Sequence, residues 1–295
     1  MMAGLNIFKN MGKKERKSFK LKPKCRVIAP LSQKGGATKS TSCVNIASVL
    51  CEIGYRVLVI DLDQQGHSTM GLGGDNLNWE YTMANVLDYE KVVEDFDPVP
   101  IEKALVKTIF DSKTGGSLWL IGANITTEEF SAAHYNDPNK KLLLSEELNK
   151  VKDKFDFIII DSPPGLDFWN WSAIFALDYI IVPLEPGHGE MRSYNDFMET
   201  LVQIKEVNPK LKHLGTFLTK SNPQTNIYKD FKLNFNTNTP GILFASEIPT
   251  DTKIKESLGF GIPIPLYAPS SKSSKAYWAL TEEVLKRCQL TEANG

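Results

Sequence analysis

The sequence predicts a single α/β domain built on a doubly wound, mostly parallel sheet. Three features of its 295 residues support this fold class. Short runs of almost uninterrupted apolar residues recur along the chain, as in strands that are buried on both faces of a parallel sheet. Segments of helical length and period alternate with these runs. No repeat of about 20–50 residues and no long Gly/Ser-rich or Pro-rich linker divides the chain.

The order of elements is clearest near the start of the chain. CRVIAPLS, residues 25–32, is a candidate buried strand, and a glycine-rich loop follows it. From Lys39 onward the apolar positions have helical spacing, and this helix is expected to end near Gly54. RVLVIDLD, residues 56–63, is the next strand and ends in carboxylates. A strand, a loop, a helix and a strand in this order form a βαβ unit, whose two strands are parallel.

The same alternation continues toward the C-terminus. Further strands are predicted at residues 117–124, 155–165, 179–186, 213–220 and 241–249. Helices are predicted at residues 140–154, 190–207 and 274–288. The polar stretch 73–116 has no clear period and is expected to hold loops.

Composition excludes several classes of protein. The chain is 42% hydrophobic and 23% charged with a net charge of −1, which is typical of a soluble protein. No run approaches the ~20 apolar residues that a membrane-spanning helix needs. The first residues lack the apolar core of a secretory signal, so a cytoplasmic location is expected. The four cysteines show neither C-x-x-C spacing nor a metal-ligand cluster, which favours buried thiols in a reducing compartment.

The N-terminal segment is strongly basic. Between Lys9 and Arg26 the chain has nine Lys or Arg residues and one acid, Glu15. We therefore expect a flexible basic arm at residues 1–24 and a folded domain at residues 25–295. Such an arm suits contact with nucleic acid or anionic lipid, and a role in solubility alone is an equally good interpretation.

The loop QKGGATKST, residues 33–41, has the chemistry of a phosphate-binding loop. Gly35 and Gly36 allow the backbone to approach phosphates without a Cβ clash. Lys39 opens the following helix and can reach phosphate oxygens, while the Ser40 hydroxyl suits Mg²⁺. Thr38 stands where the ordinary G-x-x-x-x-G-K-[ST] loop has its last glycine, so we expect an ordinary negative φ at this residue.

Acidic residues end two of the predicted strands. Asp61 and Asp63 lie in DLDQQG, and Asp161 lies in IIIDSPPG. Because the carboxyl ends of parallel strands form one edge of the sheet, these acids are expected to converge on the loop. A nucleotide-hydrolysing site needs an acid near hydrated Mg²⁺ and a polar group that orients water. The alternative is that they are strand-end acids that only form turns.

Together these segments resemble the ParA/MinD family of ATPases. The pattern K-G-G-x-x-K-[ST], with its additional Lys34, is similar to the family's deviant Walker A box. VLVIDLDQQGHST resembles its switch I segment, with Gln64 in place of the usual proline, and FDFIIIDSPPGL resembles its Walker B and switch II segment. Later stretches also follow the family's order, so the resemblance runs from about residue 26 to residue 285.

The resemblance implies a P-loop NTPase-like fold that hydrolyses ATP with Mg²⁺. It implies catalytic roles for Lys34, Lys39 and Asp63 and metal binding by Ser40, Asp63 and Asp161. Asp61 is expected to position the loop. Lys34 is expected to reach phosphates held by a second copy, which makes dimerisation depend on ATP. The implied nucleotide-binding residues are Lys34, Gly35, Gly36, Ala37, Thr38, Lys39, Ser40, Thr41, Pro249 and Asp251.

The resemblance also implies partners. They are a second copy in the ATP state, non-specific double-stranded DNA and a ParB-like adaptor, with the protein associated with the nucleoid. Gln224 replaces an arginine that many ParA chains have on their DNA-binding face. The candidate DNA-binding residues are Lys220, Lys229, Lys232, Lys253, Lys255, Lys272 and Lys275. Each of them suits a plain solvated role equally well.

Three other functions remain open. A MinD-like switch acts on a membrane or protein surface, but the C-terminal tail lacks the bulky apolar residues of a lipid anchor, so a membrane partner is not expected. A very slow ATPase can behave as a nucleotide-controlled binding module that positions a cargo. An ATP-dependent transferase or synthase on the same fold needs a substrate pocket that the sequence does not reveal.

Overall fold

A central seven-stranded sheet organises the chain. The computed structural model describes residues 24–32, 38–88, 98–110, 112–135, 137, 140–165 and 167–293. The strands are β1 (Arg26–Pro30), β2 (Arg56–Asp61), β3 (Val106–Lys107), β4 (Ser117–Ile121), β5 (Phe157–Asp161), β6 (Tyr179–Leu184) and β7 (Lys212–Leu218). Their order is β3-β4-β2-β5-β1-β6-β7, and all neighbours are parallel except β3 and β4. The predicted arm at residues 1–24 lies outside the described residues except for Lys24.

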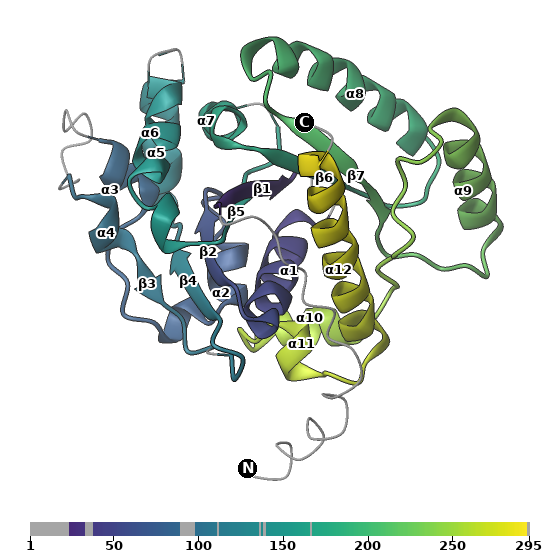
Figure 1. Cartoon of the computed structure of the whole chain (residues 1–295), viewed down its shortest axis with the longest axis horizontal. Helices are drawn as coiled ribbons and strands as arrows, with labels where there is room; N and C mark the ends of the chain where they lie inside the picture. The colour runs from purple at the N-terminus through teal and green to yellow at the C-terminus, as the bar shows by residue number, and fades with distance from the viewer. Residues whose placement is uncertain are drawn as a thin grey trace.

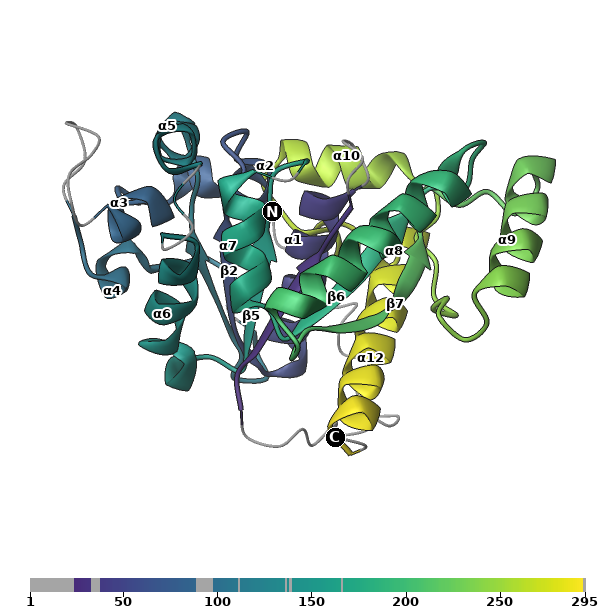
Figure 2. The ribbon, with the colours of Figure 1, turned by 90° about the horizontal axis from the view of Figure 1, so that it is seen from above.

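Helices cover both faces of the sheet (Figure 1). They are α1 (Lys39–Ile53), α2 (His67–Gly71), α3 (Met83–Leu87), α4 (Ile101–Ala104), α5 (Ile125–His134), α6 (Leu143–Asn149), α7 (Phe168–Ala176), α8 (Glu190–Val207), α9 (Asn226–Asn238), α10 (Thr252–Gly259), α11 (Ile264–Tyr267) and α12 (Lys272–Ala293). Figure 2 shows α6, α7 and α8 on one face of the sheet, while α2, α5 and α10 lie along one edge of the molecule, at the top of the view. None of the helices in the described ranges is long and apolar enough to cross a membrane.

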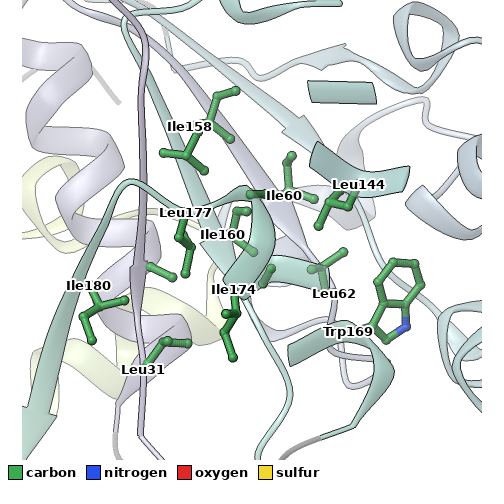
Figure 3. Close-up of a cluster of buried hydrophobic side chains, with 14 of the residues drawn as sticks. Leu31, Ile60, Leu62, Leu144, Ile158, Ile160, Trp169, Ile174, Leu177 and Ile180 are labelled. Atoms are coloured by element: carbon green, nitrogen blue, oxygen red, sulfur yellow. The ribbon is translucent and has the colours of Figure 1, made fainter. Parts of the chain in front are cut away.

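Two apolar layers explain why the strands are almost continuously hydrophobic. Side chains alternate along a strand, so Leu58 and Ile60 of β2 join one cluster while Val57 and Val59 join the other. The first cluster packs the sheet against α6, α7 and α8, and Figure 3 shows part of it, with Trp169 at its margin. The second cluster packs the sheet against α1 and α12. The strands are therefore buried on both sides, as the sequence predicted.

The predicted fold class is confirmed, with several local errors among the elements. Residues 241–249 are not a strand and make only isolated bridges, through Leu243 and Pro249. Backbone groups of Ile242, Phe244 and Ile248 still pair with β7, but side chains of α12 occupy groups between them and interrupt a continuous strand. The Glu283 carboxylate accepts from the N–H groups of Ala245 and Ser246, and Arg287 donates to carbonyls in the same stretch.

The second group of errors concerns helices. The predicted helix 140–154 is α6 between two short 3₁₀ turns, because the chain bends inward to bury Val151. The stretch 73–116 was expected to be loops, yet it contains α3, α4 and the edge strand β3. Six helices in the described part of the chain, all outside that stretch, were not predicted: α2, α5, α7, α9, α10 and α11. Most of these missed elements are short, and in α9 the three buried positions are Tyr228, Phe231 and Phe235.

A buried ion pair ties the end of α12 to the start of the sheet. Arg26, the first residue of β1, is 1% exposed. Its Nε donates to Oε1 of Glu292 at 2.7 Å and its Nη2 donates to Oε2 at 2.8 Å. The Tyr179 hydroxyl donates to the same carboxylate at 3.1 Å. This bidentate geometry offsets the cost of burying both charges and fixes α12 over the sheet.

Replacing Glu292 with Ala should lower the free energy of unfolding by about 2–3 kcal/mol, because the buried Arg26 guanidinium loses its counterion. Urea denaturation measures the change. Glu282→Ala, on the exposed side of the same helix, is the matched control and should change stability by about 0.5 kcal/mol or less. Equal effects of the two substitutions would show that the ion pair contributes nothing specific.

The same pair predicts a dependence on pH. Burial raises the pKa of Glu292, but the hydrogen bond and charge of Arg26 outweigh burial and hold this pKa below its ordinary value of 4.5. A lowered pKa means that the contribution of Glu292 is complete above pH 4.5 and is lost as the pH falls through the folded-state value. The stability difference between the wild type and Glu292→Ala should therefore shrink in acid.

Candidate nucleotide-binding site

A cleft of about 900 Å³ opens at the carboxyl ends of the central strands. Its walls come from the start of α1, the turn after β2 with α2 and the 3₁₀ turn beyond it, the turn after β5, part of α5, and the end of α10 with the two residues that follow it. In Figure 2 these elements meet along the edge where α2 and α10 lie. Parallel α/β sheets bind their ligands at this edge. Lys39, Ser40 and Asp63, which the sequence predicted to act together, all line the cleft.

The register of the sheet brings two predicted carboxylates together. Asp61 of β2 is paired with Asp161 of β5, and both side chains are fully buried. Asp61 accepts hydrogen bonds from the backbone N–H and the hydroxyl of Thr69, each at 2.8 Å, and from the Asp63 N–H at 3.1 Å. Burial, and then the charge of Asp161, raise the pKa of Asp61 well above its ordinary value. Asp61 therefore fixes the turn after β2, as expected for a positioning residue.

Asp161 has the environment of a metal ligand. Its Oδ2 accepts from the Ser68 hydroxyl at 2.7 Å, while its Oδ1 is buried and has no hydrogen-bond partner among the described residues. Burial raises the pKa of Asp161, and the hydroxyls of Ser40 and Ser68 and the charge of Lys39 oppose that rise. A free carboxylate oxygen beside the Ser40 hydroxyl supplies the hard oxygen ligands that Mg²⁺ prefers.

The donor set fits Mg²⁺ better than a self-contained metal centre. No cluster of three or more His, Cys, Asp or Glu side chains suited to a metal occurs in the described part of the chain. Mg²⁺ commonly binds through one or two protein oxygens and completes its shell with water and substrate phosphates. Ser40 and Asp161 satisfy the protein share of that requirement.

Lys39 is a buried cation at the first position of α1. Its side chain is 7% exposed. Burial lowers the pKa of Lys39, and the charges of Asp161 and Asp63 act in the opposite direction. A buried ammonium near two carboxylates and at a helix N-terminus is well placed to hold a phosphate oxygen.

Asp63 lies two residues beyond Asp61, where the chain leaves β2. It is 9% exposed, its Oδ1 accepts from the Gln65 N–H at 3.0 Å, and its carbonyl accepts from the Gly66 N–H at 2.8 Å. This tight turn holds the carboxylate in the wall of the cleft. Its position suits contact with a water molecule or a hydrated cation.

The prediction for Thr38 is wrong. Its φ is 62° and its ψ is 24°, in the left-handed region that glycine usually occupies. The chain must turn here to enter α1, and the Thr38 carbonyl already accepts the first helical bond, from Ser42. The geometry of the loop therefore overrides the preference of a β-branched residue, at a cost of about 1–2 kcal/mol. Lys34, Gly35, Gly36 and Ala37 lie outside the described residues.

Two predicted nucleotide contacts lie away from the walls of the cleft. Asp251 begins α10: its Oδ1 accepts from the Lys253 N–H, and its Oδ2 accepts from the Ser273 hydroxyl at 2.8 Å. Pro249 forms an isolated bridge with Ser221. Neither residue lines the cleft, so their contact with nucleotide stays a prediction.

The candidate DNA-binding lysines fall into two groups. Ion pairs engage Lys220 with Glu185 at 2.7 Å, Lys253 with Glu256 at 2.6 Å, and Lys232 with Glu247. The others are exposed and form no salt bridge with a described residue; they are Lys229, Lys255, Lys272 and Lys275. The last three belong to α10 and the start of α12, which the Asp251–Ser273 hydrogen bond holds together.

Sequence reasoning missed several residues of the cleft. Ser68, which donates to Asp161, is fully buried behind the cleft wall and lies in the GHST stretch shortly after the second strand, so its position was the available signal. Asp167 lines the cleft and begins α7 by accepting from the Asn170 N–H. Phe260, 65% exposed, and Met70, 40% exposed, are apolar residues of the cleft wall. No local pattern distinguished these two residues from core positions.

Comparisons with known proteins agree with this geometry. Residues 25–213 match the protein family described as AAA domain. Sporulation initiation inhibitor protein Soj from Bacillus subtilis is 31% identical over 265 residues, covering 88% of this chain and 98% of Soj. The chain belongs to the ParA/MinD family of ATPases. In this member of the family, the seven-stranded sheet carries the described cleft at the carboxyl ends of its strands.

Solved structures of relatives identify the cofactors of this ParA/MinD-family site. A Mycobacterium smegmatis protein named cobyrinic acid a,c-diamide synthase, crystallised with an ATP analog and magnesium, is 28% identical with a TM-score of 0.71, covering 90% of this chain and 96% of that one. MinD from Pyrococcus horikoshii, complexed with Mg-ADP, is 25% identical with a TM-score of 0.72, covering 90% and 98%. ATP and Mg²⁺ are the cofactors of this family site, and the oxygen ligands described above fit them.

Replacing Thr38 with Gly should raise the free energy of unfolding of the nucleotide-free protein by about 1 kcal/mol, since glycine adopts a positive φ without strain. Urea denaturation without nucleotide measures the change. The matched control is Thr41→Gly inside α1, which should instead lower stability by a few tenths of a kcal/mol, roughly the difference in helix propensity. A loss of stability in Thr38→Gly would contradict the assignment of strain to this residue.

Proposed function

We propose that this protein is a Mg²⁺-dependent ATPase of the ParA type. In this proposal it forms an ATP-sandwich dimer, binds double-stranded DNA without sequence preference, and partitions or positions a cargo. A ParB-like adaptor stimulates hydrolysis, and the protein works in the cytoplasm on the nucleoid. The observation that carries the proposal is the convergence of Lys39, Ser40, Asp63 and Asp161 at one edge of the sheet.

In the proposed reaction, each residue at the cleft has a separate role in phosphoryl transfer. Lys39 neutralises charge on the β- and γ-phosphates, and Ser40 with Asp161 would hold the Mg²⁺ ion beside them. When bound, Mg²⁺ supplies a positive charge that stabilises the transferring phosphoryl group. Asp63 orients the attacking water, and the Asp61 hydrogen bonds keep the Asp63 turn in place.

Apolar side chains beside the cleft support a dimer that covers it. Phe260 stacks on Tyr267 at 5.6 Å between ring centroids and remains 65% exposed, and Met70 is 40% exposed. Large exposed apolar side chains next to a ligand cleft favour burial against another protein. In the proposed dimer Lys34 reaches the phosphates of the second copy, and the bound γ-phosphate gives it an opposite charge to hold.

The distribution of lysine side chains supports the DNA-binding part of the proposal. Lys255, Lys272 and Lys275 are exposed, make no salt bridge with a described residue, and come from neighbouring elements. Exposed cations that form no salt bridge are available for phosphates, although Asp251 lies close enough to Lys272 for this lysine to lower its pKa, and each phosphate contact adds to the salt dependence of binding. Lys220 and Lys253 are weaker candidates because Glu185 and Glu256 already pair with them.

Two alternatives have specific support. A MinD-like switch on a membrane or protein surface is favoured by the similarity to MinD from Pyrococcus horikoshii. An ATP-dependent synthase is favoured by the name of the Mycobacterium smegmatis relative. Stimulation of hydrolysis by DNA with an adaptor supports the ParA-type function, whereas stimulation by a small metabolite supports the synthase.

Lys39→Ala should abolish nucleotide binding, because no other described cation lines the start of α1. Lys34→Ala should bind ATP with near-normal affinity and remain monomeric, since its proposed role is in the partner's site. Fluorescent-nucleotide titration measures the first property and light scattering after size exclusion measures the second. Dimers of Lys34→Ala at saturating ATP would refute the cross-subunit role.

Asp63→Ala should bind duplex DNA in the presence of ATP and not of ADP, because the variant stalls hydrolysis in the dimer. Its affinity should fall by about tenfold or more between 50 mM and 200 mM salt if several phosphates are contacted. In the same background, replacing Lys255, Lys272 and Lys275 with Ala should weaken binding and flatten the salt dependence. Lys220→Ala is the control and should change binding little.

Failure of that experiment is also informative. If Asp63→Ala dimerises with ATP but binds no DNA, the nucleic-acid part of the proposal is wrong, and the membrane or protein-surface alternative is favoured. Liposomes containing anionic lipid then replace duplex DNA in the same assay.

A further inference from the structure

The hydroxyl of Thr38 has no hydrogen-bond partner in the described protein, although it is buried. Thr38 lines the nucleotide cleft and directly precedes Lys39. Seven other described hydroxyls are also buried without a partner, but among these residues only Thr38 lines the cleft, and a buried polar group without a partner needs an explanation. At the wall of a cleft suited to a polyanion, the missing partner is most simply an oxygen of the ligand.

Backbone strain at Thr38 also supports a contact between this residue and a ligand. In the described part of the chain the non-glycine residues with positive φ are Thr38, at 62°, and Lys220, at 48°. Lys220 is held by its ion pair with Glu185 and by the Thr250 hydroxyl, which donates to its carbonyl. The Thr38 side chain has no comparable hydrogen bond. Strained residues persist where a functional contact compensates for them, often at ligand clamps.

We propose that the Thr38 hydroxyl donates a hydrogen bond to a phosphate oxygen of the bound nucleotide, next to the Lys39 ammonium. This inference rests on the proposed ATP-binding function and adds a specificity-determining contact to it. A glycine, which the ordinary loop has at this position, offers no side-chain donor. A hydrogen bond to a charged oxygen is stronger than one to a neutral group, so the phosphate chain is a better acceptor than water.

The proposal predicts opposite effects of the Thr38 hydroxyl on the stability of the free protein and on the affinity for nucleotide. In the free protein the hydroxyl is destabilising, because it is buried without a hydrogen-bond partner. In the complex the same group contributes to affinity. Removing only the hydroxyl should therefore leave the free protein as stable as the wild type, or more stable, and should weaken nucleotide binding.

Thr38→Val is the decisive variant, since valine keeps the β-branched shape and removes the hydroxyl. Isothermal titration with ATP and with ADP, each with Mg²⁺, should show a loss of affinity of about tenfold or more, the range expected for a hydrogen bond to a charged group. The melting temperature without nucleotide should be no lower than that of the wild type. Thr38→Ser restores the hydroxyl and should bind within about threefold of the wild type.

The outcomes distinguish this inference from the proposed function. Wild-type affinity in Thr38→Val overturns the hydroxyl contact, because the shape alone is then sufficient. Equal losses in the Val and Ser variants overturn it as well, because the β-branched shape is then the determinant. A wild-type protein that binds neither ATP nor ADP overturns the ATP-binding function and this inference together.

Discussion

The pairing of β2 with β5 is the constraint on which the site depends. It places Asp61 beside Asp161, so two carboxylates are buried side by side at the end of the sheet. Burial of like charges is costly unless hydrogen bonds and cations compensate. Thr69, Ser68 and Lys39 provide that compensation, and each is positioned by α1 or α2. The same hydroxyls and the Lys39 ammonium that stabilise the two buried carboxylates therefore lie at the cleft. In the proposed complex, a bound cation and phosphate would add further contacts to these groups.

Rigid packing on both faces of the sheet allows strain at the phosphate end of α1. The helix is buried between the sheet and α12, and the Arg26–Glu292 pair anchors the far end of α12 to β1. This scaffold holds Thr38 in a left-handed conformation that its side chain disfavours. Natural proteins commonly depart from local preferences at functional sites, where the surrounding fold supplies the missing stability.

Whether a surface lysine is available to a ligand depends on the acidic residues close to it in space, and its position in the sequence does not reveal them. The sequence offers many lysines late in the chain, and no one-dimensional pattern separates those that an acid neutralises from those that remain available. The structure does so: Glu185 pairs with Lys220 and Glu256 pairs with Lys253, whereas Lys255, Lys272 and Lys275 make no salt bridge with a described residue. A DNA-binding surface on α10 and the start of α12 is therefore a narrower hypothesis than the sequence allowed.

The sequence alone determined the fold class and the convergence of Lys39, Ser40, Asp63 and Asp161 at one edge of the sheet, because both depend on the order of strands and loops along the chain. Apolar runs define buried strands, and acids at strand ends must meet at one edge when the strands are parallel. Tertiary structure decided the rest. The stretch 241–249 is not a strand because Glu283 and Arg287 take several of its backbone groups, and Asp251 serves as a helix cap. Thr38 has a positive φ because the turn into α1 requires it. For the stretch 241–249 the deciding partners lie on α12, about 40 residues further along the chain, where periodicity and residue preference carry no information.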